Sequence, residues 1–181
     1  MKTNLDRLFF EAKQNHRKAQ KGLYDLYVGK MLAIALSYVK QKNDAEDIVL
    51  NAFYKAFTKI NQCEKSQAFP SWLRRIVIND SISFIRKNKN ILYVDTEVIE
   101  NIGEEEEETF EDLYSINIKE ILAEMPDGYR LVFNLYVFEE MKHKQIASVL
   151  NISEGTSKSQ LSKAKKWLKS YFKNSKNEKE I

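Results

Sequence analysis

The sequence predicts an all-α protein in which two small helical domains are joined by an acidic flexible linker, the second domain being a helix-turn-helix. The 181 residues include only 5 Gly and 2 Pro, a scarcity that favours helices over a turn-rich β-sandwich. Apolar residues recur at spacings of three and four in both halves, as amphipathic helices require. Between the halves, residues 95–112 carry ten acidic side chains and no Lys or Arg. We therefore place the domains at residues 1–90 and 116–181 and the linker at 91–115.

Two amphipathic helices are predicted at the start of the first block, because apolar side chains three and four apart lie on one face. The apolar residues are Leu5, Leu8, Phe9 and Ala12 in the first helix, and Leu23, Leu26, Tyr27, Met31 and Ile34 in the second.

The next predicted helix, over residues 44–57, has the most regular pattern in the chain. Asn43 is expected to cap it, with Glu46 as the partner in a capping box. Asp44, Glu46 and Asp47 also suit the positive end of the helix dipole. Its apolar positions follow the helical rule without a miss, continuing to residue 60: Ala45, Ile48, Val49, Ala52, Phe53, Ala56, Phe57 and Ile60.

A polar loop over residues 61–67 precedes another helix, which Pro70 opens because proline is well tolerated in a first turn. The apolar stripe of this helix is Phe69, Trp72, Leu73, Ile76 and Val77. Its polar face carries side chains at spacings of four, four and three, flanked by Arg74 and Lys87: Arg75, Asn79, Ser83 and Arg86.

The second block is predicted to contain several shorter helices. One begins near Tyr114 and ends before Met125 and Pro126. Residues 129–138 are apolar enough for a buried helix, although their Val, Phe and Tyr content leaves a strand as the alternative. Further helices are predicted over 143–150 and from Glu154 to about residue 172.

Residues 145–153 have the features of a helix-turn-helix. Ala147 is small enough for two helices to cross closely, and Asn151 can adopt the left-handed conformation that ends a helix. Ile152 can fill the space between the helices, and Ser153 can cap the second one. In such a motif the second helix enters the DNA major groove. Its outward polar residues are the predicted DNA contacts, with base pairing expected from Gln160 and from Lys: Lys158, Ser159, Gln160, Ser162, Lys163 and Lys166.

The same composition argues against several classes of site. Cys63, His16 and His143 are the only Cys and His residues, too few for a structural zinc site. We expect His143, among lysines, to be solvated or to face DNA. We expect no metal, no cofactor and no small-molecule substrate. The N-terminus lacks the apolar segment of a signal peptide and no apolar run is long enough to span a bilayer, so we expect a cytoplasmic protein.

The joint order of motifs resembles the extracytoplasmic-function group of the sigma-70 family of RNA polymerase sigma factors. In the first block the resemblance rests on residues 44–49, Phe53, residues 72–76, Asn79 and Arg86. In the second it rests on residues 125–126, Arg130, residues 135–136, 145–147 and 154–156. It covers nearly the whole chain. The positions at which this sequence departs from the usual family residues are Leu50, Ser83, Gln145, Ser157 and Gln160.

The resemblance implies a mechanism without catalytic residues. The 44–57 helix would dock on the clamp helices of the largest polymerase subunit through Glu46, Asp47 and Asn51. The helix-turn-helix would bind the minus-thirty-five promoter element, and an anti-sigma factor would regulate the protein. The loop would capture a base flipped from the minus-ten element, and the next helix would hold the opened strand. Trp72 would stack at the melting edge, although its place in the apolar stripe of the helix favours a role in the core. The residues implied for that element are Lys65, Ser66, Gln67, Trp72, Arg74, Arg75, Asn79 and Arg86.

Three alternative classes are open to the residues themselves. A helix-turn-helix regulator that does not bind polymerase explains the second block but leaves the motifs of the first block without a use. An enzyme would need converging acid–base groups, whereas adjacent residues such as Glu46 and Asp47 diverge by about 100° on a helix. A structural helical adaptor would have no reason to carry a lysine-faced helix behind such a turn.

Overall fold

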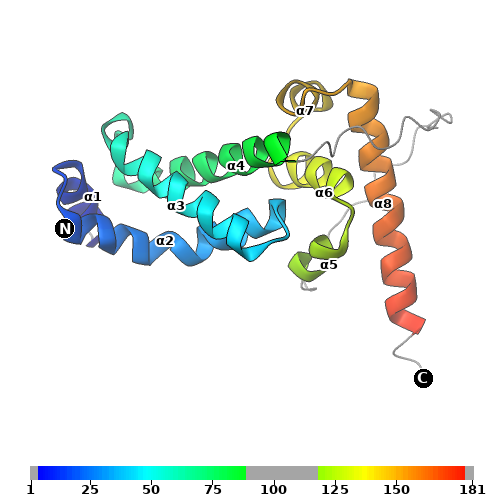
Figure 1. The fold of residues 1–181 in the computed structure, drawn as a ribbon, viewed down its shortest axis with the longest axis horizontal. Coiled ribbons are helices and arrows are strands. Elements are labelled where there is room, and N and C mark those ends of the chain that lie inside the picture. The colour runs from blue at the N-terminus through cyan, green and yellow to red at the C-terminus, as the bar shows by residue number, and fades with distance from the viewer. Residues whose placement is uncertain (1–3, 89–117, 178–181) are drawn as a thin grey trace. The chain divides into compact units, whose positions relative to one another are not determined.

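The computed structural model describes residues 4–88 and 118–177, and within these ranges every regular element is a helix (Figure 1). This confirms the all-α prediction. The chain divides into two compact units, unit 1 (Met1–Asn88) and unit 2 (Lys89–Ile181). The predicted linker at residues 91–115 lies outside the described residues. None of the described helices is both long and apolar enough to cross a membrane.

Unit 1 is a bundle in which α2 packs against α1, α3 and α4, and α3 also packs against α4. Its centre is filled by fully buried apolar side chains, among them Phe9, Leu23, Phe53 and Leu73. The chain order is α1 (Asn4–Lys13), α2 (Arg17–Tyr38), α3 (Lys42–Thr58), the short turns η1 (Ile60–Gln62) and η2 (Ser66–Ala68), and α4 (Phe69–Asn88).

The start of α3 differs from the prediction. The helix begins at Lys42, and its cap residue Gln41 makes no side-chain capping bond, so the capping box expected from Asn43 and Glu46 is wrong. The physical reason lies in the backbone, because the N–H of Ala45 already donates to the carbonyl of Gln41 at 3.1 Å. The first helical turn is thereby closed before Asn43 can act as a cap.

Other expectations for unit 1 have mixed outcomes. Pro70 lies in the first turn of α4, as predicted. Leu26 was assigned to the apolar stripe of its helix, but its side chain is 51% exposed on α2. Trp72 and Ile76 are only half-buried, so the α4 stripe is narrower than its sequence suggests.

Unit 2 is built around α8, which packs against α6 and α7. Residues 129–138 are helical, which excludes the strand alternative, although the second part forms a wider π-helical turn. The predicted start near Tyr114 lies outside the described residues. The elements are α5 (Ile118–Glu124), α6 (Asp127–Phe133), the π-helical turn η4 (Asn134–Phe138), α7 (His143–Leu150) and α8 (Glu154–Asn177).

The interior of unit 2 contains a charged side chain. Arg130 is 2% exposed, and its guanidinium lies 2.8 Å from the carboxylate of Asp127 one turn earlier on α6. A second guanidinium nitrogen donates over a long 3.5 Å to the carbonyl of Leu122 on α5. Burial lowers the pKa of Arg130, whereas the Asp127 carboxylate opposes this effect. The Arg130 side chain, paired with Asp127 on its own helix, thus reaches from α6 to the backbone of α5 inside the core.

Candidate functional site

One face of α3 is turned fully to solvent. Glu46, Asp47 and Asn51, which were predicted as contacts, are all exposed on it. Two residues that the sequence reasoning did not select as contacts lie on the same face, because one follows Asp47 by three residues and the other follows four residues later. They are Leu50 and Tyr54, whose side chains are 62% and 72% exposed.

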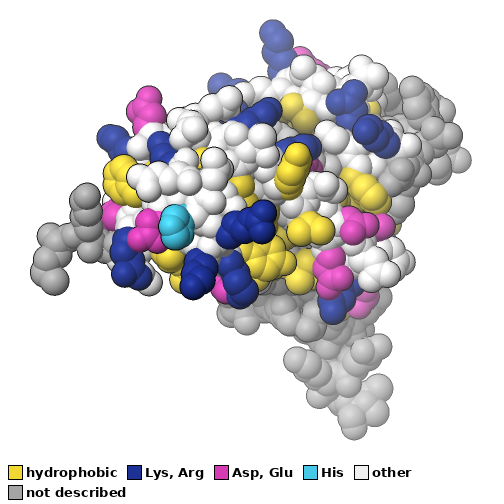
Figure 2. Space-filling view, turned by 60° about the vertical axis from the view of Figure 1, so that its left-hand side comes forward, with side chains coloured by type: hydrophobic (Ala, Val, Ile, Leu, Met, Phe, Trp, Pro, Cys, Tyr) yellow, Lys and Arg dark blue, Asp and Glu magenta, His cyan; other side chains and the backbone are white. Residues whose placement is uncertain are grey.

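The signal that could have found this pair is available in the sequence. Leu50 and Tyr54 are four residues apart and both fall outside the buried α3 stripe, so they form an exposed apolar pair that follows the acids Glu46 and Asp47 along the helix. Large exposed apolar side chains that lie together mark interaction surfaces more often than single ones do. Figure 2, in which the left side of Figure 1 comes forward, shows that hydrophobic side chains lie among basic and acidic ones on this face of the molecule.

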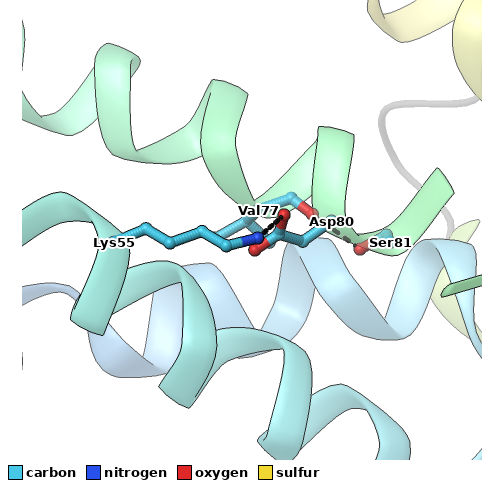
Figure 3. Close-up of polar contacts among 4 residues, drawn as sticks. All are labelled: Lys55, Val77, Asp80 and Ser81. Carbon is cyan, nitrogen blue, oxygen red and sulfur yellow. Dashed lines mark hydrogen bonds and ion pairs between the residues drawn. The ribbon is translucent and has the colours of Figure 1, made fainter. Parts of the chain in front are cut away.

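Behind that face, α3 is tied to α4 by an ion pair. Lys55 Nζ lies 2.6 Å from Asp80 Oδ1, and the Asp80 side chain is only 15% exposed whereas that of Lys55 is 51% exposed (Figure 3). Next to it, the hydroxyl of the buried Ser81 donates to the carbonyl of Val77 at 2.8 Å. The two helices that carry the predicted docking and DNA-holding residues are therefore joined by a specific polar contact.

The polar face predicted for α4 is present. Arg75, Asn79, Ser83 and Arg86 are all exposed, at spacings that place them along one side of the helix. Arg74 is half-buried beside them. Trp72, also half-buried, has its ring centroid 6.2 Å from that of Phe69. Its indole is thus partly packed against the core and partly available at the surface.

The loop before α4 holds its three predicted residues in different environments. Lys65 and Gln67 are exposed, whereas Ser66 is 5% exposed and faces inward. The hydroxyl of Ser66 donates to Asp6 Oδ1 on α1, and Gln67 Nε2 donates to the same oxygen at 3.0 Å. An expected direct DNA contact from the Ser66 side chain does not fit this placement, because its hydroxyl is occupied by Asp6.

The turn between α7 and α8 has the geometry that the sequence predicts. Asn151 adopts φ 57° and ψ 48°, the left-handed conformation, and its N–H donates to the carbonyl of Ala147. Ser153 Oγ accepts from the N–H of Thr156 at 2.9 Å, which caps α8. Ile152 is half-buried, and its N–H donates to the same Ala147 carbonyl at 3.0 Å. The turn is thus stabilised by bonds at both helix ends.

Five of the six residues predicted as DNA contacts on α8 reach its surface. Lys158 and Lys166 are exposed, and Ser159, Ser162 and Lys163 are half-buried. The Ser159 hydroxyl donates to the carbonyl of Thr156 at 3.0 Å, so it rests against its own helix in this state. Lysines predominate on this surface, which suits contact with phosphates.

Gln160 is placed differently from the prediction. Its side chain is 7% exposed, and its Oε1 is buried without a hydrogen-bond partner. A Cβ added to Gly128 on α6 would lie 3.0 Å from that oxygen, so the amide is pressed against the α6 backbone. The reason is periodicity, because position 160 falls in the same stripe as Ala164 and Leu168. The expected base contact from Gln160 does not fit this placement.

His143 begins α7 and is half-buried, so the expectation of a solvated or DNA-facing imidazole is wrong in part. Its ring stacks on Tyr136 with centroids 4.9 Å apart, and its Nδ1 lies 2.9 Å from the hydroxyl of the buried Ser157 on α8. Burial lowers the pKa of His143, and the charge of Lys158 adds to the effect. The imidazole therefore links η4, α7 and α8, and its surroundings disfavour its charged form.

Among the described residues, no group of three or more His, Cys, Asp or Glu side chains is placed to hold a metal ion. Cys63 is a buried free thiol whose Sγ lies 3.4 Å from the carbonyl of Lys65. Burial raises the pKa of this thiol, which keeps it protonated and weakens it as a nucleophile or a ligand.

Comparison with known proteins gives matches in both units. Residues 23–91 match the family model described as Sigma-70 region 2, and residues 115–168 match Sigma-70, region 4. RNA polymerase sigma factor SigV of Bacillus subtilis (strain 168) is 32% identical over 136 residues, 75% of this chain and 80% of the relative. ECF RNA polymerase sigma factor SigM of the same organism is 29% identical over 154 residues, 83% of this chain and 93% of the relative.

A solved structure described as CnrH in complex with the cytosolic domain of CnrY has a similar fold. It aligns with a TM-score of 0.50 at 18% identity and covers 94% of this chain and 99% of that one. At this identity the likeness concerns the fold alone.

Proposed function

This chain belongs to the extracytoplasmic-function group of the sigma-70 family, and from that premise we propose which of its surfaces carry out each part of the work. The function itself is to direct bacterial RNA polymerase to promoters and to initiate transcription there. Unit 1 is assigned to core polymerase and the minus-ten element, and unit 2 to the minus-thirty-five element.

The exposed face of α3 is the proposed docking surface for the clamp helices of the largest polymerase subunit. It combines the acids Glu46 and Asp47 and the amide of Asn51 with the apolar pair Leu50 and Tyr54. Interfaces of this kind have an apolar centre, where most of the binding energy is concentrated, and a polar rim. This apolar centre on a solvent-facing helix is the observation that carries the assignment, because a regulator that never met polymerase would have no use for it.

The α4 face and the preceding loop form the proposed minus-ten surface. Arg75, Asn79 and Arg86 are exposed in a row that can follow a single strand, with Arg74 and Trp72 beside them. Cationic and aromatic side chains suit an unpaired strand, since they neutralise phosphates and stack on bases. The loop that contains Lys65 and Gln67 is proposed to receive a flipped base. Flipping costs a few kcal/mol, which these contacts must offset.

The N-terminal part of α8 is proposed to enter the major groove at the minus-thirty-five element. The capped start of the helix and its surface residues Lys158, Ser159 and Ser162 support this assignment. Lys163 and Lys166 lie five and eight residues after Lys158 and suit phosphate contacts that position the helix. Gln160 is assigned to the interior of unit 2.

We further propose that an anti-sigma factor regulates the protein. We also propose that it acts in the cytoplasm, which contains both the promoters and the polymerase. The family membership supports both, and the structural neighbour was likewise solved with a bound protein domain. The same surfaces serve macromolecules, so neither a cofactor nor a small-molecule substrate is assigned.

The proposal is tested by run-off transcription on a library of genomic fragments, using Bacillus subtilis core polymerase with and without the purified chain. The expected result is a set of transcripts that need the chain, whose mapped starts share two upstream sequence elements. The variant Leu50→Asp/Tyr54→Asp should abolish these transcripts, while binding of promoter DNA by unit 2 persists. If the wild-type chain binds DNA but neither binds core polymerase nor yields such transcripts, the regulator alternative is correct.

A further inference from the structure

Helix α1 is connected to the loop that follows η1 by a contact between distant parts of the chain. Asp6 Oδ1 accepts hydrogen bonds from Ser66 Oγ and from Gln67 Nε2, residues 60 and 61 positions later. α1 also packs against η1 and η2. Yet α1 lies before residue 23, where the match to Sigma-70 region 2 begins. Nothing in that match accounts for the contact.

We propose that Asp6 is a positioning residue that sets the shape and hydrogen-bonding polarity of the base-capture loop, so that α1 takes part in promoter selectivity. This inference rests on the proposed role of the loop in the minus-ten contact. Asp6 itself is not placed in contact with DNA.

The loop needs such an anchor because it has little regular structure of its own. η2 spans three residues, and the backbone bond that closes it runs from the N–H of Ala68 to the carbonyl of Lys65 at 3.1 Å. Three-residue turns of this type have poor hydrogen-bond geometry and rarely hold a conformation alone. The Asp6 carboxylate supplies two charge-assisted bonds, which are shorter and stronger than neutral ones. We therefore expect that removal of the Asp6 carboxylate makes the backbone of this loop more mobile.

The bond to Gln67 also decides which end of its amide faces the solvent. An ionised carboxylate accepts hydrogen bonds and cannot donate them, so it must face the NH₂ end of the amide. The carbonyl oxygen of Gln67 is then left to point away from Asp6, on an exposed side chain. Because this oxygen is an acceptor, it favours a captured base that has a hydrogen-bond donor at its edge, such as the exocyclic amine of cytosine or adenine. Thymine, which offers a carbonyl at that position, is disfavoured.

If Asp6 acted on DNA only through its charge, its removal would have an effect opposite to the one expected of a positioning residue. A carboxylate near a DNA surface repels phosphates, so its loss should tighten binding and leave base preference unchanged. Positioning predicts weaker binding and relaxed preference. The sign of the change thus separates the two explanations, and Asp25, an exposed acid paired with Lys21 on α2, offers a matched loss of one negative charge.

The experiment uses the full chain bound to core polymerase and fluorescent single-stranded oligonucleotides. These carry the minus-ten strand of a promoter found by run-off transcription, with each base varied in turn. We expect Asp6→Ala to weaken binding of the preferred oligonucleotide about tenfold and to reduce the preference for an amine-bearing base at one position. Asp6→Asn keeps an acceptor but can also donate, so it should retain affinity while relaxing that preference. Asp25→Ala should change neither.

A second measurement separates positioning from general damage. Asp6→Ala should speed amide hydrogen exchange at residues 63–69 and leave core-polymerase binding and minus-thirty-five duplex binding as in the wild type. The inference is overturned if Asp6→Ala binds as tightly as Asp25→Ala with the same base preference. It is also overturned if Asp6→Ala loses polymerase and duplex binding together. A wild-type chain that directs no transcription would instead refute the proposed function, and the inference with it.

Discussion

Lys55 on α3 and Asp80 on α4 join the two helices of unit 1 through an ion pair with an Nζ–Oδ1 distance of 2.6 Å (Figure 3). The partners are not equivalent. The Lys55 side chain is 51% exposed and can be solvated alone, whereas Asp80 is 15% exposed and its Oδ2 is buried without a hydrogen-bond partner. Because the proposed polymerase surface lies on α3 and the proposed strand-holding surface lies on α4, this pair fixes one relative to the other.

Removing Lys55 should therefore cost more stability than removing Asp80. Lys55→Met leaves a carboxylate largely buried and unpaired, which we expect to cost about 1–3 kcal/mol of unfolding free energy. Asp80→Ala leaves a lysine that water can solvate, and should cost less. Urea unfolding is measured in a Trp167→Phe background, where Trp72 is the only tryptophan and reports unit 1. If the two variants lost the same unfolding free energy, the difference in burial between Asp80 and Lys55 would have no effect on stability.

The apolar pair on α3 is expected to contribute to polymerase affinity without contributing to stability. Leu50→Ser and Tyr54→Ser remove side chains that are 62% and 72% exposed, so unfolding free energy should change by less than about 0.5 kcal/mol. Core-polymerase affinity should fall about tenfold for each, as is usual at the centre of an interface. Phe10→Ser on α1, 52% exposed, is the matched control and should bind core normally. Competition binding with a labelled sigma factor measures the affinities.

The cap of α8 supplies a stability prediction for unit 2. Ser153→Ala removes the acceptor for the Thr156 N–H and should cost about 1 kcal/mol. Ser153→Asp keeps a capping oxygen and places negative charge at the positive end of the helix dipole, so it should be neutral or stabilising. Unfolding is followed by Trp167 fluorescence in a Trp72→Phe background. A loss that is the same for both variants would indicate that the hydroxyl acts through a contact other than the cap.

His143 makes the stability of unit 2 dependent on pH. Burial, and secondly the charge of Lys158, lower the pKa of the folded imidazole below its ordinary value. As pH falls through about 6.5, the unfolded chain takes up the proton first, so the folded state loses relative stability until its own lowered pKa is reached. Stability is thus greatest above that window. The charged groups around the ring, Lys158, Lys165 and the opposing Glu154, remain in the control.

The control for this pH dependence is His143→Gln, which keeps a polar side chain but does not titrate. We expect the wild type to lose more melting temperature than His143→Gln when pH is lowered from 7.5 to 5.0. Carboxylates titrate in both proteins, so the difference isolates the imidazole. Parallel curves for the two proteins would show that protonation of His143 costs the fold nothing.

Most of the fold was predicted from the helical spacing of apolar residues, and each wrong prediction has a physical cause. The buried stripe of α3 follows from spacing alone. The capping rule selected Asn43, but side-chain capping competes with backbone continuation, and the backbone bond from Ala45 to Gln41 prevailed. The contact between Asp6 and Gln67 spans 61 residues and leaves no local pattern. It could not be predicted from a single sequence, because tertiary packing alone brings α1 to the loop.

Gln160 shows the converse error, in which residue type outweighed position. Its polar side chain suggested a surface role, whereas its spacing from Ala164 and Leu168 placed it in the buried stripe. An amide oxygen buried without a partner is costly, so Gln160→Met, which conserves volume, should raise the unfolding free energy by about 1 kcal/mol.

If the Gln160 side chain is interior, the Gln160→Met variant should also bind a minus-thirty-five duplex with wild-type affinity and base preference. Lys158 is exposed and lies two residues before Gln160 on α8. Lys158→Ala should weaken the binding of the same duplex and make it less sensitive to salt. Fluorescence anisotropy at two salt concentrations measures both. A Gln160→Met variant that gains stability but loses discrimination at a single base pair would place the amide in the groove after all, because a buried side chain can affect readout only by moving the whole helix.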